Sequence, residues 1–172
     1  MALSATLDGP MAIRYPRDGL DPGAEVEADA PLRVGEWELI SAGRDVMFFA
    51  EGPAVQLAIQ AAIKLAGRGI QAGVVDARFI KPMDEKLLFE AAKDVKLVVT
   101  LEENSVLGGL GEGIAHALAD RGVCARTLIL GAPDSYVNHA RTSEQREKCG
   151  LSVKAISERV AEALNEIDGG GA

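Results

Sequence analysis

The sequence has few aromatic residues and almost no cysteine. Only 4% of its 172 residues are aromatic, and the two cysteines, Cys124 and Cys149, are far apart, with no Cys-x-x-Cys motif and no histidine pair beside them. This spacing argues against a zinc site or a redox dithiol, and we expect two reduced thiols. Alanine, valine, leucine and isoleucine must fill the core, which is typical of parallel strands covered by helices.

Basic residues are also in the minority. The chain has 18 lysines and arginines against 26 aspartates and glutamates, which gives a formal net charge of −8. Binding to nucleic acid needs a basic face, so we expect no nucleic-acid partner. No apolar run approaches the roughly 18 residues that cross a bilayer, and the first residues do not have the pattern of a signal peptide. We therefore expect a cytoplasmic protein with no membrane partner.

Composition divides the chain into four parts. Residues 1–17 contain an apolar start and a short strand-like segment, 11–15, and residues 18–34 form an acidic linker. Residues 35–167 alternate apolar runs with alanine-rich helical patterns, which predicts one α/β domain. Residues 168–172 are mostly glycine, and we expect a disordered tail there.

Five apolar runs in the domain predict strands. The first two predict a β-hairpin, and helical patterns separate the later ones. The strand–helix–strand order favours right-handed crossovers between parallel strands. We predict a three-layer α/β/α sandwich with a mostly parallel five-stranded sheet, in which the hairpin supplies one antiparallel strand. The predicted strands are 37–40, 46–50, 70–75, 96–100 and 125–130.

Charged residues follow two of the predicted strands. In the segment 76–85, Arg78 can pair with Asp76 or remain solvated. Glu102 and Glu103 end another strand, where two carboxylates could share a proton. Because neighbouring residues on a strand point to opposite faces, a capping or interface role is favoured over a catalytic pair.

A glycine-rich turn, Gly108–Gly113, precedes a predicted helix. Helix N-termini attract anions, but the glycine spacing differs from the dinucleotide-binding fingerprint, so close packing of the helix is the favoured interpretation. The same turn would allow a second copy of the chain to approach closely, and we expect a homodimer. The two histidines, His116 and His139, have no serine or cysteine partner in a recognisable motif, so nucleophilic catalysis has no candidate.

The segment Arg14-Tyr15-Pro16-Arg17 is the strongest candidate for ligand binding. Pro16 favours an extended backbone at Tyr15, and a repeat of about three residues then places Arg14 and Arg17 on the same side. Two guanidinium groups on one face suit a phosphate. A solvated pair at the entrance to the linker is an equally good interpretation of the spacing.

These segments together resemble a known family. Their order and sequence are similar to the C-terminal third of the 1-deoxy-D-xylulose-5-phosphate synthases, and the similarity covers nearly the whole chain. The Arg-Tyr-Pro-Arg segment and the Asp-Ala-Arg-Phe-x-Lys-Pro-x-Asp-Glu block distinguish these synthases within the transketolase-like group. The matching residues are 8–17, 76–85, 100–104, 108–111 and 130–134.

The resemblance implies a transferase that uses thiamine diphosphate and magnesium to join a two-carbon unit from pyruvate to D-glyceraldehyde 3-phosphate, with release of CO2, for isoprenoid and thiamine precursors. It implies that earlier domains hold the cofactor and the metal, so this chain alone binds neither and is inactive. Arg17, with Arg14 beside it, corresponds to the arginine that contacts the substrate phosphate. Residues 1–17 then end the pyrimidine-binding domain, and 35–167 form the transketolase C-terminal-like domain.

Two alternatives remain open at this stage. The C-terminal domain of a 2-oxo-acid dehydrogenase β subunit would share the fold, without an Arg-Tyr-Pro-Arg segment in this form. A free-standing, non-enzymatic interaction or anion-binding module would require the chain to be a natural gene product.

Overall fold

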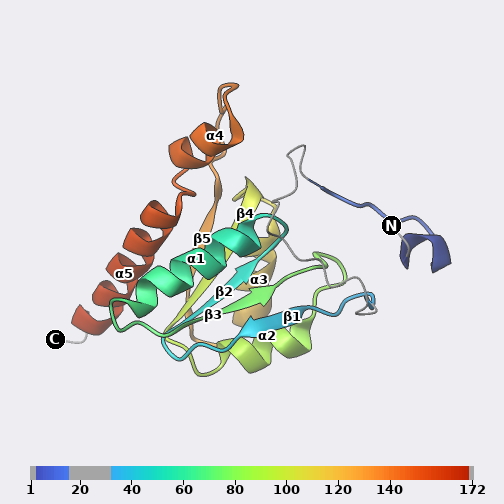
Figure 1. Ribbon diagram of the computed structural model, residues 1–172. Helices are drawn as coiled ribbons and strands as arrows, with labels where there is room; N and C mark the ends of the chain where they lie inside the picture. Colours follow the sequence, from blue (N-terminus) through green and yellow to red (C-terminus); the bar gives the residue numbers. More distant parts are fainter. Residues whose placement is uncertain (1–2, 16–31, 171–172) are drawn as a thin grey trace.

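The computed structural model describes residues 3–15 and 32–170 (Figure 1). A five-stranded sheet lies between two layers of helices, as predicted. The strands are β1 (Glu38–Ser41), β2 (Val46–Ala50), β3 (Ala72–Asp76), β4 (Leu97–Ser105) and β5 (Arg126–Ala132). The helices are α1 (Ala54–Ala66), α2 (Glu85–Ala92), α3 (Leu110–Asp120), α4 (Thr142–Lys148) and α5 (Val153–Gly169), with a 3-10 turn, η1 (Leu3–Thr6), near the start.

The spatial order of the strands is β1-β3-β2-β4-β5. Strands β3, β2, β4 and β5 are parallel, and β1 runs antiparallel to β3 at one edge. The chain leaves β2 toward β3 on one side and then crosses to β4 on the other side. In sheets of this kind, the carboxyl ends of the central strands at such a reversal are the usual place for a functional site.

The predicted hairpin is wrong, because β1 pairs with β3 and not with β2. The connection between β1 and β2 crosses the amino end of β3, where the backbone amides of residues 44–46 donate to the carbonyl of Gln71. Asp45 fixes the crossing by accepting a hydrogen bond from the Gln71 amide at 2.8 Å. Gly43 and Gly73 meet there, and a Cβ on either would clash with the backbone of the other. The close approach of these two glycines thus allows the β1–β2 connection to cross β3, where the sequence predicted a tight hairpin turn.

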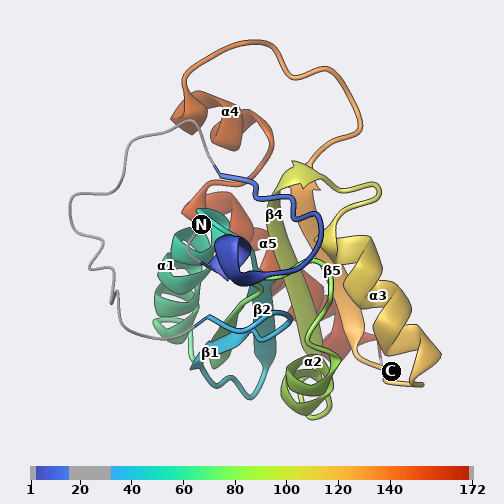
Figure 2. The ribbon, with the colours of Figure 1, turned by 90° about the vertical axis from the view of Figure 1, so that its right-hand side faces the viewer.

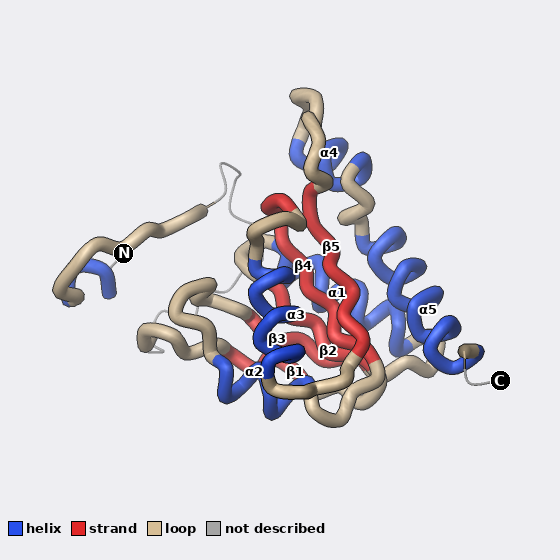
Figure 3. The backbone as a smooth tube through the Cα atoms, turned by 180° about the vertical axis from the view of Figure 1, so that it is seen from behind, coloured by secondary structure: helices blue, strands red, loops and turns tan. Residues whose placement is uncertain are grey.

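Each face of the sheet has its own hydrophobic core. Helices α1 and α5 cover one face and contact each other, and their core includes Phe48, Leu65 and Val160. Helices α2 and α3 cover the opposite face, as the view from behind shows (Figure 3). Central strands covered on both faces explain the uninterrupted apolar run of β2, which is buried throughout. No helix in residues 3–15 and 32–170 is long and apolar enough to cross a membrane.

The two ends of the chain differ in part from the expectation. Asp168 and Gly169, which were expected in the tail, belong to α5, and the Asp168 carboxylate lies 2.8 Å from Lys96 Nζ. Residues 11–15 do not form the predicted strand, since they pair with none of the strands described above. Residues 16–31, which include Arg17 and most of the linker, lie outside the described residues.

Candidate functional site

Four acidic residues lie at the carboxyl ends of the three central strands. Glu51 follows β2, Asp76 is the last residue of β3, and Glu102 and Glu103 lie in the second half of β4. The register pairs Ala50 of β2 with residues 76 and 101 of its two neighbours, which brings the four acids to one edge. We call this set the acidic edge.

Asp76 pairs with Arg78, as one of the two interpretations of the sequence predicted. The Arg78 Nε lies 3.5 Å from the Asp76 carboxylate, and the same guanidinium contacts Glu38 of β1. Burial raises the pKa of the Asp76 carboxyl to about 6, and the charge of Glu51 adds to this effect. Burial is the larger of the two causes, and the Arg78 guanidinium is shared between Asp76 and Glu38. Asp76 is therefore an acid that changes charge near pH 6.

Glu102 caps the N-terminus of α3. Its two carboxylate oxygens accept hydrogen bonds from the amides of Leu110 (3.1 Å) and Gly111 (3.0 Å), and the side chain is fully buried. A Cβ at residue 109 would collide with this carboxylate, and one at residue 111 would lie 2.5 Å from Ile129. The glycine-rich turn therefore serves close packing, as expected. The carboxylate takes the place that an external anion would need.

Glu103 points to a different partner, as the alternation along a strand predicted. Its carboxylate forms an ion pair with Arg146 of α4, and each side chain is about one quarter exposed. The pair joins α4 to the sheet beyond the carboxyl ends of the strands (Figure 2). Glu102 and Glu103 thus have separate structural roles, one in capping and one in holding α4.

Glu51 is the fourth acid, and sequence analysis did not single it out because it occurs in a short Glu-Gly-Pro turn. The residue is half-buried, and its amide donates to the Leu101 carbonyl of β4 at 3.3 Å. Burial raises the pKa of the Glu51 carboxyl, the charge of Arg14 lowers it, and Glu102 and Glu103 raise it further. Arg14 is thus within electrostatic reach of the acidic edge.

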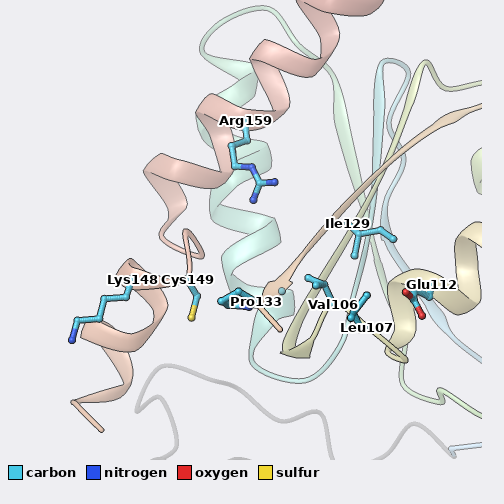
Figure 4. A pocket seen from close by; sticks show the side chains of 9 residues that line it. Val106, Leu107, Glu112, Ile129, Pro133, Lys148, Cys149 and Arg159 are labelled. Carbon is cyan, nitrogen blue, oxygen red and sulfur yellow. The ribbon is translucent and has the colours of Figure 1, made fainter. Parts of the chain in front are cut away.

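An open depression of about 510 Å³ lies beside the outer strand β5 (Figure 4). Val106 and Leu107 form one wall, Arg159 of α5 and Lys148 of α4 lie opposite, and Glu112 at its rim accepts a hydrogen bond from the Gly108 amide at 2.8 Å. The depression was not predicted, because it forms where three elements distant in sequence meet. The titratable side chains of its lining are Glu112, Lys148, Cys149 and Arg159.

The remaining candidates do not form a reactive cluster. His116 and His139 are exposed, on α3 and in the loop before α4, and the two cysteines are free thiols. Among the described residues, no group of three or more histidine, cysteine or acidic side chains is arranged to hold a metal ion.

Comparison with known proteins places this geometry in a family. The model of the transketolase C-terminal domain matches residues 35–156. A 1-deoxy-D-xylulose-5-phosphate synthase of Aquifex aeolicus (strain VF5) is 39% identical over 155 residues, which cover 90% of this chain and 24% of that protein. The same-named protein of Stutzerimonas stutzeri (strain A1501) is 42% identical over 158 residues, 91% of this chain and 24% of its own length. The chain thus spans about a quarter of these relatives.

Comparison with solved structures finds the same fold. A structure described as a split gene transketolase, inactive β4 tetramer, has a TM-score of 0.86 and 32% identity, and covers 95% of this chain and 53% of its own. A transketolase of Pichia stipitis is 20% identical with a TM-score of 0.59 over 78% of this chain and 19% of its own, which shows the fold alone. The chain belongs to the transketolase C-terminal domain family, and its curated relatives are 1-deoxy-D-xylulose-5-phosphate synthases.

Proposed function

We propose that the chain is the C-terminal domain of a 1-deoxy-D-xylulose-5-phosphate synthase. Such an enzyme condenses pyruvate with D-glyceraldehyde 3-phosphate and releases CO2, using thiamine diphosphate and magnesium. The observation that carries the proposal is the identity of about 40% to proteins of that name, over 90% of this chain. Relatives of this name favour the synthase over a 2-oxo-acid dehydrogenase β subunit and over a free-standing binding module.

The residues of the acidic edge do not fit thiamine diphosphate. The N-termini of α2 and α3 would be natural seats for a diphosphate, but the carboxylates of Asp84 and Glu102 already accept their amides. Glu51 and Asp76 would add negative charge beside the phosphates. We therefore assign cofactor binding and chemistry to other parts of the synthase, and we propose that this chain alone is inactive.

Arg17, with Arg14 beside it, supplies the contact of this chain with substrate. The proposal is that their guanidinium groups hold the phosphate of D-glyceraldehyde 3-phosphate, because the planar fork of arginine matches phosphate oxygens. Of the two, Arg14 lies within the described residues, where it is exposed.

Kinetics of the complete synthase test this role. Arg17→Ala should lower kcat/KM for D-glyceraldehyde 3-phosphate about ten- to a hundred-fold, since a charge-assisted contact is worth about 1.5–3 kcal/mol. Decarboxylation of pyruvate alone should change much less, because pyruvate has no phosphate. Arg14→Ala, measured alongside, shows which arginine contributes more. Equal losses in both reactions would contradict the proposal and indicate a structural role for the segment.

We also propose that the protein is a cytoplasmic homodimer, in keeping with its two free thiols, which suit a reducing compartment. Within the glycine-rich turn, Gly109 packs on Glu102 and Gly111 on Ile129 of the same chain, whereas Gly108 has open space around it. A second candidate for the dimer contact is the β5 edge, where the depression of Figure 4 exposes Leu107. Sedimentation equilibrium that gives only an 18.1 kDa species at high concentration would contradict the dimer.

A further inference from the structure

The block 76–85 contacts one short segment of the chain at several points. This segment, Gly35-Glu36-Trp37-Glu38, is where the chain enters β1, and we call it the entry segment. The block is one of the two segments that distinguish the synthases, and none of its side chains takes part in the proposed reaction. Its contacts with the entry segment indicate another role.

Trp37 makes two hydrogen bonds with the block. Its backbone amide donates to Asp84 Oδ2 at 3.0 Å, and its indole Nε1 donates to the Phe79 carbonyl at 2.7 Å. The side chain is buried and lies against Phe49 of β2, with 5.9 Å between the ring centroids. A buried indole N–H without an acceptor would be unfavourable, and the backbone of the block provides that acceptor.

The entry segment contacts the block on both sides of Trp37. Glu38 forms an ion pair with Arg78. Gly35 has a φ of +78°, and a Cβ at this position would lie 3.0 Å from Pro82 Cγ, so its backbone lies directly against the proline ring. The partners of the entry segment thus come from both halves of the block.

We propose that the block 76–85 is a docking site for the entry segment, and that Asp84 is the positioning residue of this site. One Asp84 oxygen accepts the Trp37 amide, and the other accepts the Leu87 amide at 3.0 Å. A single carboxylate therefore joins the entry segment to the N-terminus of α2. Asp84 acts through Trp37 and does not touch substrate, and all of these contacts lie within the described residues.

The consequence for the synthase rests on the proposed function. The chain spans about a quarter of its curated relatives, so the domain must take a defined orientation relative to the rest of such an enzyme. Docking of the entry segment fixes the direction from which the chain arrives at β1, and it thereby restricts the orientations open to the domain. The block then serves the assembly of the synthase and not contact with substrate.

Hydrogen exchange at Trp37, followed by NMR, tests the docking in the 172-residue chain, where this residue is the only tryptophan. Asp84→Ser keeps a hydroxyl that can cap α2 but removes the second acceptor. If the entry segment docks as a unit, exchange of the indole N–H should rise about ten-fold, as expected for the loss of a hydrogen bond to a charged group. Glu85→Gln removes the neighbouring carboxylate, which pairs with Arg121, and should leave that exchange unchanged. Equal indole exchange in the two variants would overturn the proposal.

Gly35→Ala tests the same contact from the entry segment and leaves α2 unchanged. The added Cβ would press on Pro82, so indole exchange should again rise, by at least about three-fold. Gly69→Ala is the control, because it introduces similar backbone strain at a φ of +79° with open space around its Cβ. The amide of Phe48, in the buried strand β2, reports any general loss of stability in each variant.

An increase in Gly69→Ala as large as that in Gly35→Ala, each taken relative to the Phe48 amide, would contradict the docking site. Neither measurement involves catalysis, so their failure is distinct from failure of the proposed synthase activity.

Discussion

Glu102 provides from within the chain the negative charge that a bound anion would bring to the N-terminus of α3. A fully buried carboxylate is stable there because two amides and the helix dipole compensate for its lost hydration. Part of this could be predicted, since the alternation along a strand separated Glu102 from Glu103. The specific partner could not be predicted, because the capped helix begins eight residues later and its position depends on packing.

Replacement of Glu102 should therefore destabilise the domain. Glu102→Gln leaves one helix amide facing an NH2 group and should lower the free energy of unfolding by about 1–3 kcal/mol. Glu103→Gln is the matched control, since its ion pair with Arg146 is partly exposed and should be worth less than about 1 kcal/mol. Urea unfolding of both variants gives the comparison. Similar losses in the two variants would contradict the capping role.

Asp76 makes stability depend on pH. Its pKa is raised from 3.8 to about 6 in the folded chain, so between these values the folded state binds more protons than the unfolded state. Stability from Asp76 is therefore present at low pH and decreases as the pH rises through that window. Because the side chain is 26% exposed, we expect about 1–2 kcal/mol. Asp76→Asn should remove this decrease in urea unfolding at pH 4 and pH 7, and an unchanged difference would contradict the assignment.

Among the elements, the β1–β2 connection shows where prediction from a sequence fails. Two apolar runs joined by a Gly-Arg-Asp turn have the local signature of a hairpin, and nothing local indicates that a later strand lies between them. The parallel strands were easier to predict, because a buried apolar run followed by an amphipathic helix specifies a crossover of known hand. Strand type followed from local pattern, whereas strand order depended on residues about 30 positions away, at Gly73.

Gly43→Ala tests the crossing. An added Cβ would clash with the backbone of Gly73 and Val46, so the connection must move, and we expect a loss of about 2–4 kcal/mol in the free energy of unfolding. Gly67→Ala is the control, since this residue has helical φ and ψ angles and its Cβ would lie 3.4 Å from its nearest neighbour, the Lys64 carbonyl. It should change stability by less than about 1 kcal/mol. A tolerated Gly43→Ala would contradict the tight crossing.

For the whole molecule, the sequence predicted the three-layer sandwich, the mixed sheet and the family better than it predicted the site. The fold depends on periodic patterns, which each segment carries by itself. The acidic edge depends on which strand ends become neighbours. No local pattern marks Glu51, which belongs to this edge only because β2 lies between β3 and β4. The two arginines were found as a sequence motif, and of the two only Arg14 lies within the described residues.

The most direct test of the account is a chimeric enzyme. The matching quarter of the Stutzerimonas stutzeri synthase is replaced by this chain, and formation of 1-deoxy-D-xylulose 5-phosphate from pyruvate and D-glyceraldehyde 3-phosphate is measured. A domain that shares 42% identity and supplies Arg14 and Arg17 should support turnover within about ten-fold of the parent enzyme, a loss of about 1.4 kcal/mol in transition-state stabilisation. A folded chimera that binds thiamine diphosphate but forms no product would contradict the assignment.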